Sequence, residues 1–122
     1  RVDSLQCEKL TAHGTPPAPR HSHAAAISGT RLLVSGGSNK DGVFGDLQLL
    51  ELRTCTWSQP LQPLLSVPAV VPHATRHGHC IMPLPPSTLP SGGDVVLMFG
   101  GYAQRGFSSN WLSLLHLSPA TG

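Results

Sequence analysis

Two short segments of the chain carry histidines at a spacing that could bind a metal ion. Arg20–Ala24 reads RHSHA and Arg76–Cys80 reads RHGHC, so each places two histidines two positions apart. If both segments are strands, the two histidines of each pair point to the same face. Two such pairs could supply the ligands of a tetrahedral zinc site, with Cys80 as a spare ligand. The alternative is that the same structural element is repeated in the chain.

The residues around these histidines repeat as well, which favours the second interpretation. Arg20 stands three positions before His23, and Arg76 stands three positions before His79. In each copy an apolar run follows and ends in a double glycine, Gly36-Gly37 in the first and Gly100-Gly101 in the second. A loop and then Asp46 or Asn110 come nine residues after the second glycine. Such an ordered set found twice predicts a repeat architecture.

The two copies differ in length and in the register of their last strand. Arg20 to Gly36 is 16 residues and Arg76 to Gly100 is 24, so the second copy carries an eight-residue insertion, expected near residues 83–93. In the last strand, a constant offset places His116 on Leu52. A slip of one residue instead lays the segment LLHL, 114–117, on LLEL, 49–52. The sequence leaves both registers open.

Short apolar segments bounded by glycine predict strands. The segments 31–37 and 94–101 are apolar on both faces, which is typical of strands buried within a stack of sheets. In the segments 46–52 and 110–117 apolar and polar residues partly alternate, so we expect strands with one face more exposed to solvent. The segment HAAAISG could begin a helix, which Gly29 would end early. The proline-rich segments 12–19 and 59–72 are poor candidates for central strands.

The ordered set resembles the kelch repeat. The residues that carry the resemblance are Pro19 to Trp57 and Thr75 to Leu117, nearly the whole chain. The N-terminal segment CEKLTAHGTPPAPR, Cys7 to Arg20, is similar to the end of a preceding repeat, with Cys7 where the family usually has Trp. No aromatic residue precedes Gly36, and the second copy ends before its own Trp.

The resemblance implies an all-β fold, a fragment of a kelch-type β-propeller with about two four-stranded blades plus a flanking strand. The expected organisation is the end of a preceding blade and a linker over 1–19, a blade over 20–59, a connector over 60–75 and a blade over 76–122. Each blade is one small sheet that cannot bury both faces alone, so neighbouring blades must stack. Paired glycines suit a crowded turn in which a Cβ would clash.

The resemblance also assigns roles to individual residues. In the family the Arg position of the motif and the residues after the double glycine often line the binding face. Carried over, these candidate binding residues are Arg20, Arg76, Asn39, Lys40, Gln104 and Arg105. Structural roles fall to Gly36, Gly37, Gly100, Gly101, His23, His79 and Trp57. Since His23 and His79 occupy the histidine position of the repeat itself, a structural hydrogen bond is the simpler interpretation for both.

Composition narrows the class of partner. Lys and Arg number 8 and Asp and Glu 6, a net charge of +2 without a basic run, which does not favour nucleic acid. Charged residues make up 11% of the chain, against about 25% in a typical soluble domain, which fits a surface covered by neighbours. No apolar run is long enough for a transmembrane helix. Three cysteines without close pairing mildly favour a reducing compartment, so we expect a cytoplasmic protein.

No motif for catalysis accompanies the repeats. The glycines around Ser35 lack the spacing of a nucleophile elbow, and no phosphate-binding or dinucleotide-binding pattern is present. We therefore expect a non-enzymatic module, without a cofactor or metal, that binds a partner protein through its loops. The alternatives are a subunit of a large assembly or a substrate receptor of a ubiquitin ligase, and a propeller enzyme or a zinc protein that uses the histidine pairs.

Overall fold

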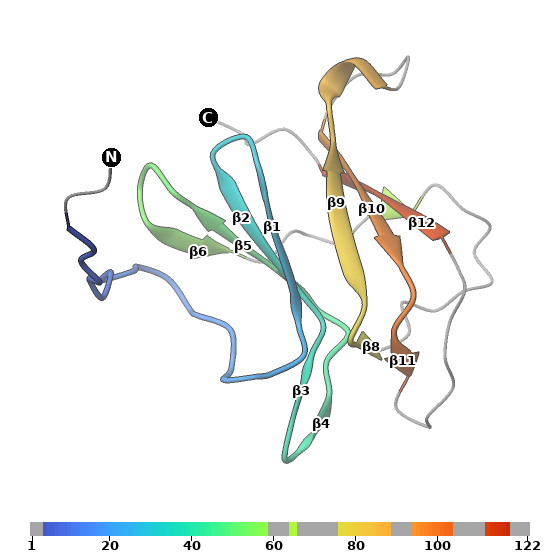
Figure 1. Cartoon of the computed structure of the whole chain (residues 1–122), viewed down its shortest axis with the longest axis horizontal. Coiled ribbons are helices and arrows are strands. Elements are labelled where there is room, and N and C mark those ends of the chain that lie inside the picture. The colour runs from blue at the N-terminus through green and yellow to red at the C-terminus, as the bar shows by residue number, and fades with distance from the viewer. Residues whose placement is uncertain (1–3, 59–63, 66–75, 89–93, 104–111, 118–122) are drawn as a thin grey trace.

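The described part of the chain consists of antiparallel β-sheets. The computed structural model (Figure 1) describes residues 4–58, 64–65, 76–88, 94–103 and 112–117. Within these ranges there is one short 3₁₀ helix, Pro86–Thr88, and no α-helix. Two of the sheets have four strands each. The prediction of an all-β chain with two four-stranded units is confirmed.

The first sheet is built from the first copy of the repeat. Its strands are β1 (Ala24–Ser28), β2 (Arg31–Ser35), β5 (Leu47–Glu51) and β6 (Thr56–Ser58), in the order β1-β2-β5-β6. A two-residue turn joins β1 to β2, and Gly29 adopts the positive φ of 59° that such a tight hairpin needs. Beyond β6, His13 forms an isolated parallel bridge with Thr56.

The second sheet takes three of its strands from the second copy. These are β9 (Cys80–Leu84), β10 (Asp94–Phe99) and β12 (Leu112–Leu117), and the order is β7-β12-β10-β9. The outer strand β7 (Leu64–Leu65) precedes the other three in the chain and lies within the stretch expected to be a connector. An outer position suits a proline-rich stretch, because an edge strand pairs on one side only. The residues inserted relative to the first copy fall between β9 and β10, where the 3₁₀ helix lies.

Two small two-stranded sheets follow the double glycines. After Gly37 the chain forms the hairpin β3 (Ser38–Asn39) and β4 (Gly42–Val43), and after Gly101 strand β11 (Tyr102–Ala103) pairs with β8 (Arg76–His77). Figure 1 shows β3, β4, β8 and β11 at the same end of the molecule. We call this end, with the residues of these four strands and the turn Lys40–Asp41, the loop end.

The strand pairing settles the register that the sequence left open. In the first sheet Leu33 of β2 lies opposite Leu49 of β5, and in the second sheet Leu97 of β10 lies opposite Leu114 of β12. Since Leu33 and Leu97 stand at the same distance before the double glycine, Leu49 corresponds to Leu114. The slipped alignment of LLEL on LLHL is therefore the structural one, with one residue more between Gly101 and β12 than between Gly37 and β5.

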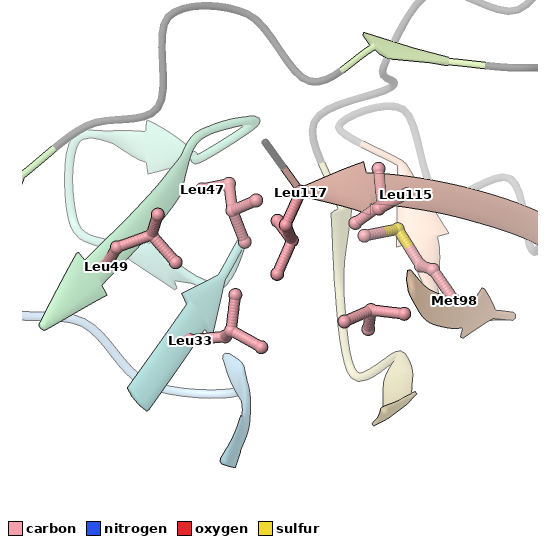
Figure 2. Close-up of a cluster of buried hydrophobic side chains, with 7 residues drawn as sticks. Leu33, Leu47, Leu49, Met98, Leu115 and Leu117 are labelled. Carbon is pink, nitrogen blue, oxygen red and sulfur yellow. The ribbon is translucent and has the colours of Figure 1, made fainter. Parts of the chain in front are cut away.

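The core lies between the two four-stranded sheets. It consists of buried side chains from facing strands: Leu33, Leu47, Leu49, Val96, Met98, Leu115 and Leu117. Figure 2 shows the three leucines of the first sheet pointing towards Leu117, Leu115 and Met98 of the second. The partly buried Ile81 of β9 packs against this cluster. Each sheet thus buries one apolar face against the other, which neither could do alone.

Two predictions of local structure were wrong. Residues 46–52 were expected to have one wetter face, yet Gln48 and Leu50 of β5 are both buried. Gln48 donates from Nε2 to Oδ2 of Asp46, so its amide group is partly satisfied inside the sheet.

The second wrong prediction concerns Ala24–Ser28, where a short helix seemed possible. This segment is strand β1, because it pairs over its whole length with β2 and tertiary pairing overrides the helix propensity of alanine.

Among the described residues there is no helix with the length and hydropathy that a membrane crossing needs.

Candidate functional site: the loop end and the joint beneath it

Backbone hydrogen bonds join the two copies of the repeat just below the loop end. The amide of Gly37 donates to the carbonyl of Arg76 at 2.8 Å, and the amide of Arg76 donates to the carbonyl of Phe44 at 3.1 Å. A third bond runs from the amide of Gly78 to the carbonyl of Ser22 at 2.8 Å. Because all three use main-chain groups, they fix the relative position of the two copies whatever the loop side chains do. We call this region the joint.

A buried histidine of the second copy contacts the first copy beside these backbone hydrogen bonds. Nε2 of His79 lies 3.0 Å from Oγ of Ser35, the residue before the first double glycine. A Cβ on Gly36, whose φ is +60°, would lie 2.7 Å from Cε1 of His79 and would also collide with the carbonyl oxygen of Arg76. Only glycine fits here, both sterically and in backbone conformation. The structure therefore places His79 and Gly36 in one contact between the two sheets.

Burial changes the acid–base behaviour of His79. Loss of water around the ring disfavours its charged form, and the positive charge of Arg76 adds to this, so the pKa of His79 falls from 6.5 to about 4. At neutral pH the ring is therefore uncharged, with one nitrogen available as an acceptor and the other as a donor. Nδ1 is buried without a hydrogen-bond partner among the described residues.

The second glycine of each pair makes the same contact in both copies. A Cβ on Gly37 would lie 2.8 Å from the carbonyl oxygen of His21 and 2.9 Å from Cβ of His23. A Cβ on Gly101 would lie 2.8 Å from the carbonyl oxygen of His77 and 2.8 Å from Cβ of His79. Both glycines have positive φ, 96° and 91°. The repeat read from the sequence is thus a repeated three-dimensional contact between the double glycine and the histidine segment.

Arg20 is held by groups of its own chain. Its guanidinium makes two hydrogen bonds to the carboxylate of Asp46, 2.6 Å from Nη1 and 3.0 Å from Nη2, and Nη1 also donates to the carbonyl of Gly36 at 2.9 Å. The guanidinium lies 4.0 Å from the ring centre of Phe44. Burial by itself would raise the pKa of Asp46, but the hydrogen bonds from Arg20 and Gln48 outweigh it and lower that pKa below 3.8.

Arg76 occupies the matching place in the second copy. Its Nη1 lies 3.4 Å from the carbonyl oxygen of Gly100, as Nη1 of Arg20 lies near that of Gly36. The side chain is buried, and burial lowers its pKa from the ordinary value of arginine. Both motif arginines therefore support the first carbonyl of a double glycine. Their expected role in binding a partner stays a prediction.

Two further candidates, the half-buried Asn39 and the exposed Lys40, lie on the β3–β4 hairpin. Asn39 accepts a hydrogen bond at Oδ1 from the amide of Asp41 at 2.8 Å, which shapes the turn, and its Nδ2 donates to the carbonyl of Pro19 at 3.3 Å. Lys40, at the tip, is exposed. Gln104 and Arg105 lie outside the described residues, so their role also stays a prediction.

The geometry of the histidine segments differs from the expectation for regular strands. Ser22 and Gly78, the residues between the paired histidines, have φ values of 55° and 67°, so the backbone turns there and the two-residue alternation is broken. His77 stacks on the ring of Tyr102, with centroids 5.8 Å apart, whereas His79 faces Ser35. The prediction that each pair shares one strand face was therefore wrong. Within the described residues, no group of three or more His, Cys, Asp or Glu side chains could hold a metal ion.

For several residues that matter here, the sequence did not predict the contact or position that the structure shows. Ser35 was considered only as a nucleophile, yet its hydroxyl meets His79 across the joint. Tyr102 is half-exposed at the loop end, and its position directly after the second double glycine was the available signal. Arg31 and Asp94 form an ion pair that links the two sheets, 63 residues apart in the chain, which no local pattern indicates. Trp57, by contrast, was singled out for a structural role; it lies in β6 opposite Leu50, and that role stays a prediction.

Comparison with known proteins gives partial matches. No protein-family model matches the chain. It is 42% identical to acyl-CoA-binding domain-containing protein 5 of Arabidopsis thaliana over 62 residues, 50% of this chain and 10% of that protein. It is 41% identical to the Rab9 effector protein with kelch motifs of Rattus norvegicus over 46 residues, 38% of this chain and 12% of that protein. It is 30% identical to kelch domain-containing protein 2 of Bos taurus over 89 residues, 73% of this chain and 19% of that protein.

The chain therefore spans about a tenth to a fifth of the length of these relatives. Two of the three carry kelch in their names, so the chain is similar over part of its length to proteins with kelch motifs. The all-β fold of paired antiparallel sheets is compatible with a fragment of a kelch-type propeller.

Proposed function

We propose that the chain is part of a kelch-type β-propeller and that its loop end binds a partner protein. The repeated contact of double glycine and histidine segment supports the family, and the partial similarity to proteins with kelch motifs agrees with it. One of these proteins is named as an effector of Rab9, which supports a protein as the class of partner proposed here. In this proposal the chain is not an enzyme.

The observation that carries the proposal is the position of the joint directly beneath the loops. The amide of Gly37 and the carbonyl of Arg76 adjoin β3 and β8, the first strands of the two loop-end sheets, and their 2.8 Å hydrogen bond holds both sheets in fixed relation. Loops carried on a rigid scaffold are the usual place for binding residues. The loop end therefore offers side chains in two neighbouring copies whose spacing does not change.

The exposed side chains define what this end could recognise. Lys40 offers an ammonium group, which donates charge-assisted hydrogen bonds to carboxylates or carbonyls. Tyr102, stacked on His77, offers an aromatic ring and a hydroxyl, a combination that is common in protein interfaces. We infer a protein partner that presents acidic or main-chain acceptor groups next to an apolar side chain.

Affinity capture with matched variants tests the proposal. The immobilised chain is incubated with lysate, and the retained proteins are identified by mass spectrometry. Lys40→Ala and Tyr102→Ala are expected to lose a protein that the wild type retains. Arg53→Ala is the control, since Arg53 is exposed in the β5–β6 turn at the opposite end of the first sheet, and it is expected to retain that protein. Equal retention by all four chains, or no specific retention by any, would overturn the proposal.

A further inference from the structure

We propose that the turn between β3 and β4 is a site of spontaneous covalent modification, at which Asp41 converts to isoaspartate through a cyclic succinimide formed with the amide nitrogen of Gly42. The reaction needs no enzyme and no co-reactant other than water. It goes beyond the binding of a partner at the loop end, because it changes the chain itself. Only its effect on the partner rests on the proposed function.

The sequence places the reactive pair at one position. Asp41 is followed by glycine, whereas every other aspartate and asparagine is followed by a larger residue, in the pairs Asp3-Ser4, Asn39-Lys40, Asp46-Leu47, Asp94-Val95 and Asn110-Trp111. A side chain on the following residue hinders the approach of its amide nitrogen to the carboxyl carbon, and glycine has none. Ring closure is therefore least hindered between Asp41 and Gly42.

The structure leaves both reacting groups accessible. Asp41 is exposed in the turn, and its carboxylate has no hydrogen bond or ion pair with another described residue. Only its main-chain amide is engaged, which donates to Oδ1 of Asn39 at 2.8 Å. A Cβ on Gly42 would meet nothing within 4 Å, so the space beside the Gly42 nitrogen is open as well. A succinimide ring therefore has room to form.

The hairpin that carries the turn is short enough to open. Strands β3 and β4 pair over two residues each, Ser38 with Val43 and Asn39 with Gly42. A two-stranded hairpin of this length has little stability of its own, and local opening of such an element costs little free energy. Opening lets the Gly42 nitrogen turn towards the carboxyl carbon of Asp41.

The other aspartates of the two sheets are held by arginines. The carboxylate of Asp46 accepts two hydrogen bonds from Arg20, and that of Asp94 forms an ion pair with Arg31. Ring closure expels the hydroxyl of a protonated carboxyl group, and an ion pair favours the charged form. Asp46 and Asp94 are therefore internal controls within the same chain, each lacking both the freedom and the following glycine of Asp41.

The reaction balances without an oxidant or a reductant. The Gly42 nitrogen forms a bond to Cγ of Asp41 and loses its proton, the carboxyl group loses its hydroxyl, and the two leave as one water molecule. Water then opens the ring at one of its two carbonyl carbons. Attack at Cγ restores aspartate. Attack at the main-chain carbonyl carbon leaves the chain running through Cβ and Cγ, which is isoaspartate.

Isoaspartate lengthens the main chain of the turn by one carbon atom. Loop length fixes the register of a hairpin, and Asn39 pairs with Gly42 across the turn residues Lys40 and Asp41. The extra atom therefore disrupts this pairing and moves Lys40, whose ammonium group is proposed to meet the partner. An aged chain is expected to retain less of the partner than a fresh one.

The change is expected to stay within the hairpin. Directly after β4, the amide of Phe44 donates to the carbonyl of Gly37 at 2.8 Å, and the carbonyl of Phe44 accepts from the amide of Arg76 at 3.1 Å. These bonds anchor the chain at the base of the hairpin. The modified chain therefore keeps its two sheets and the joint while its turn is altered.

Ageing of the purified chain with two variants tests the proposal. Wild type, Asp41→Asn and Asp41→Glu are incubated at neutral pH, and their peptides are followed by mass spectrometry with electron-transfer fragmentation. Wild type is expected to form first a species lighter by one water and then isoaspartate at position 41. Asp41→Asn should react several-fold faster, because it loses ammonia instead of hydroxide. Asp41→Glu should stay unchanged, because its longer side chain closes a six-membered ring far more slowly.

Absence of isoaspartate from both wild type and Asp41→Asn would overturn the proposal. Equal amounts of isoaspartate at Asp41 and Asp46 would do so too, since exposure and the following glycine would then have no effect. Circular dichroism confirms that the chains stay folded during the incubation.

The capture experiment separates this proposal from the proposed function. If aged wild type retained the partner as well as aged Asp41→Glu does, the effect of isoaspartate on binding would be refuted. A fresh chain that retains no partner would refute the proposed function, whereas the isoaspartate content at position 41 is measured without any partner. The two failures are therefore distinguishable.

Discussion

Nε2 of His79 lies 3.0 Å from Oγ of Ser35, a residue that precedes it by 44 positions. The histidine belongs to the second copy of the repeat and the serine to the first, so this contact joins the two sheets. It lies beside the backbone bond between Gly37 and Arg76 and beside the glycine whose Cβ would displace the ring. The histidine that suggested a metal site from the sequence is thus packed into the joint.

The first prediction concerns the stability of the chain at acidic pH. Since the pKa of His79 is about 4 in the folded chain and near 6.5 when unfolded, the unfolded state binds the proton more tightly. The free energy of unfolding should be fully retained above about pH 6.5 and lost as the pH falls towards 4, by up to roughly 3 kcal/mol at about 1.4 kcal/mol per pKa unit. Urea unfolding at a series of pH values measures this loss.

His79→Gln is the informative variant for the acid prediction, because glutamine does not titrate. It should be less stable at neutral pH and should show a smaller loss between about pH 6.5 and 4. His21→Gln, a change at an exposed histidine, serves as the matched control and should keep the wild-type dependence. Identical pH profiles for His79→Gln and wild type would contradict the buried, neutral ring.

The second prediction compares two glycines with nearly the same backbone conformation. Gly36 and Gly29 have φ values of 60° and 59°, but a Cβ on Gly36 would collide with the Arg76 carbonyl and the His79 ring, whereas nothing lies within 4 Å of a Cβ on Gly29. Gly29→Ala should cost about 1 kcal/mol of conformational strain. Gly36→Ala should cost about 3 kcal/mol or more, because the joint must open. Equal losses in the two variants would show that the close contact does not exist.

The third prediction uses the residues between the paired histidines. Ser22 and Gly78 occupy the same place in the two copies and both have positive φ. Ser22→Gly should therefore be neutral or stabilising by up to about 1 kcal/mol, since the left-handed strain is relieved. Gly78→Ala should destabilise by about 1 kcal/mol. Thermal unfolding measures the change in stability of both variants. A destabilising Ser22→Gly would contradict the equivalence of the two turns.

The fourth prediction concerns the carboxylate that holds Arg20. Asp46→Ala removes both hydrogen bonds to the guanidinium, whose side chain is only 5% exposed, so the charge is left with fewer partners. We expect a loss of about 2 kcal/mol in the free energy of unfolding. Asp41→Ala, at an exposed carboxylate in the nearby turn, should change it by less than about 0.5 kcal/mol. The same loss at both positions would argue against a structural role for Arg20.

The main features of the fold could be predicted from the sequence because they depend on local chemistry. A strand that is apolar on both faces and ends in a double glycine is unusual, and it occurs twice, as β2 and β10. The spacing from each double glycine to the next strand then indicated the repeat. These features need no knowledge of which strands pair.

The rest depended on tertiary contacts. Strand β1 reads as the start of a helix until its pairing with β2 is known, and the register of β12 follows only from its partner β10. Gln48 is buried, and only its Nε2 is paired, with Asp46, whereas Oε1 has no hydrogen-bond partner among the described residues. At the candidate site, the histidines could be placed in the repeat, but the role of Ser35 could not, since its partner His79 is 44 residues away.

A double-mutant cycle on Ser35 and His79 tests the central claim most directly. The free energies of unfolding of wild type, Ser35→Ala, His79→Ala and the double variant give the coupling between the two side chains. A buried hydrogen bond across the joint predicts a coupling of about 1 kcal/mol. Losses that add to within about 0.3 kcal/mol would mean that the two residues do not interact, and the side-chain contact of His79 across the joint would be contradicted.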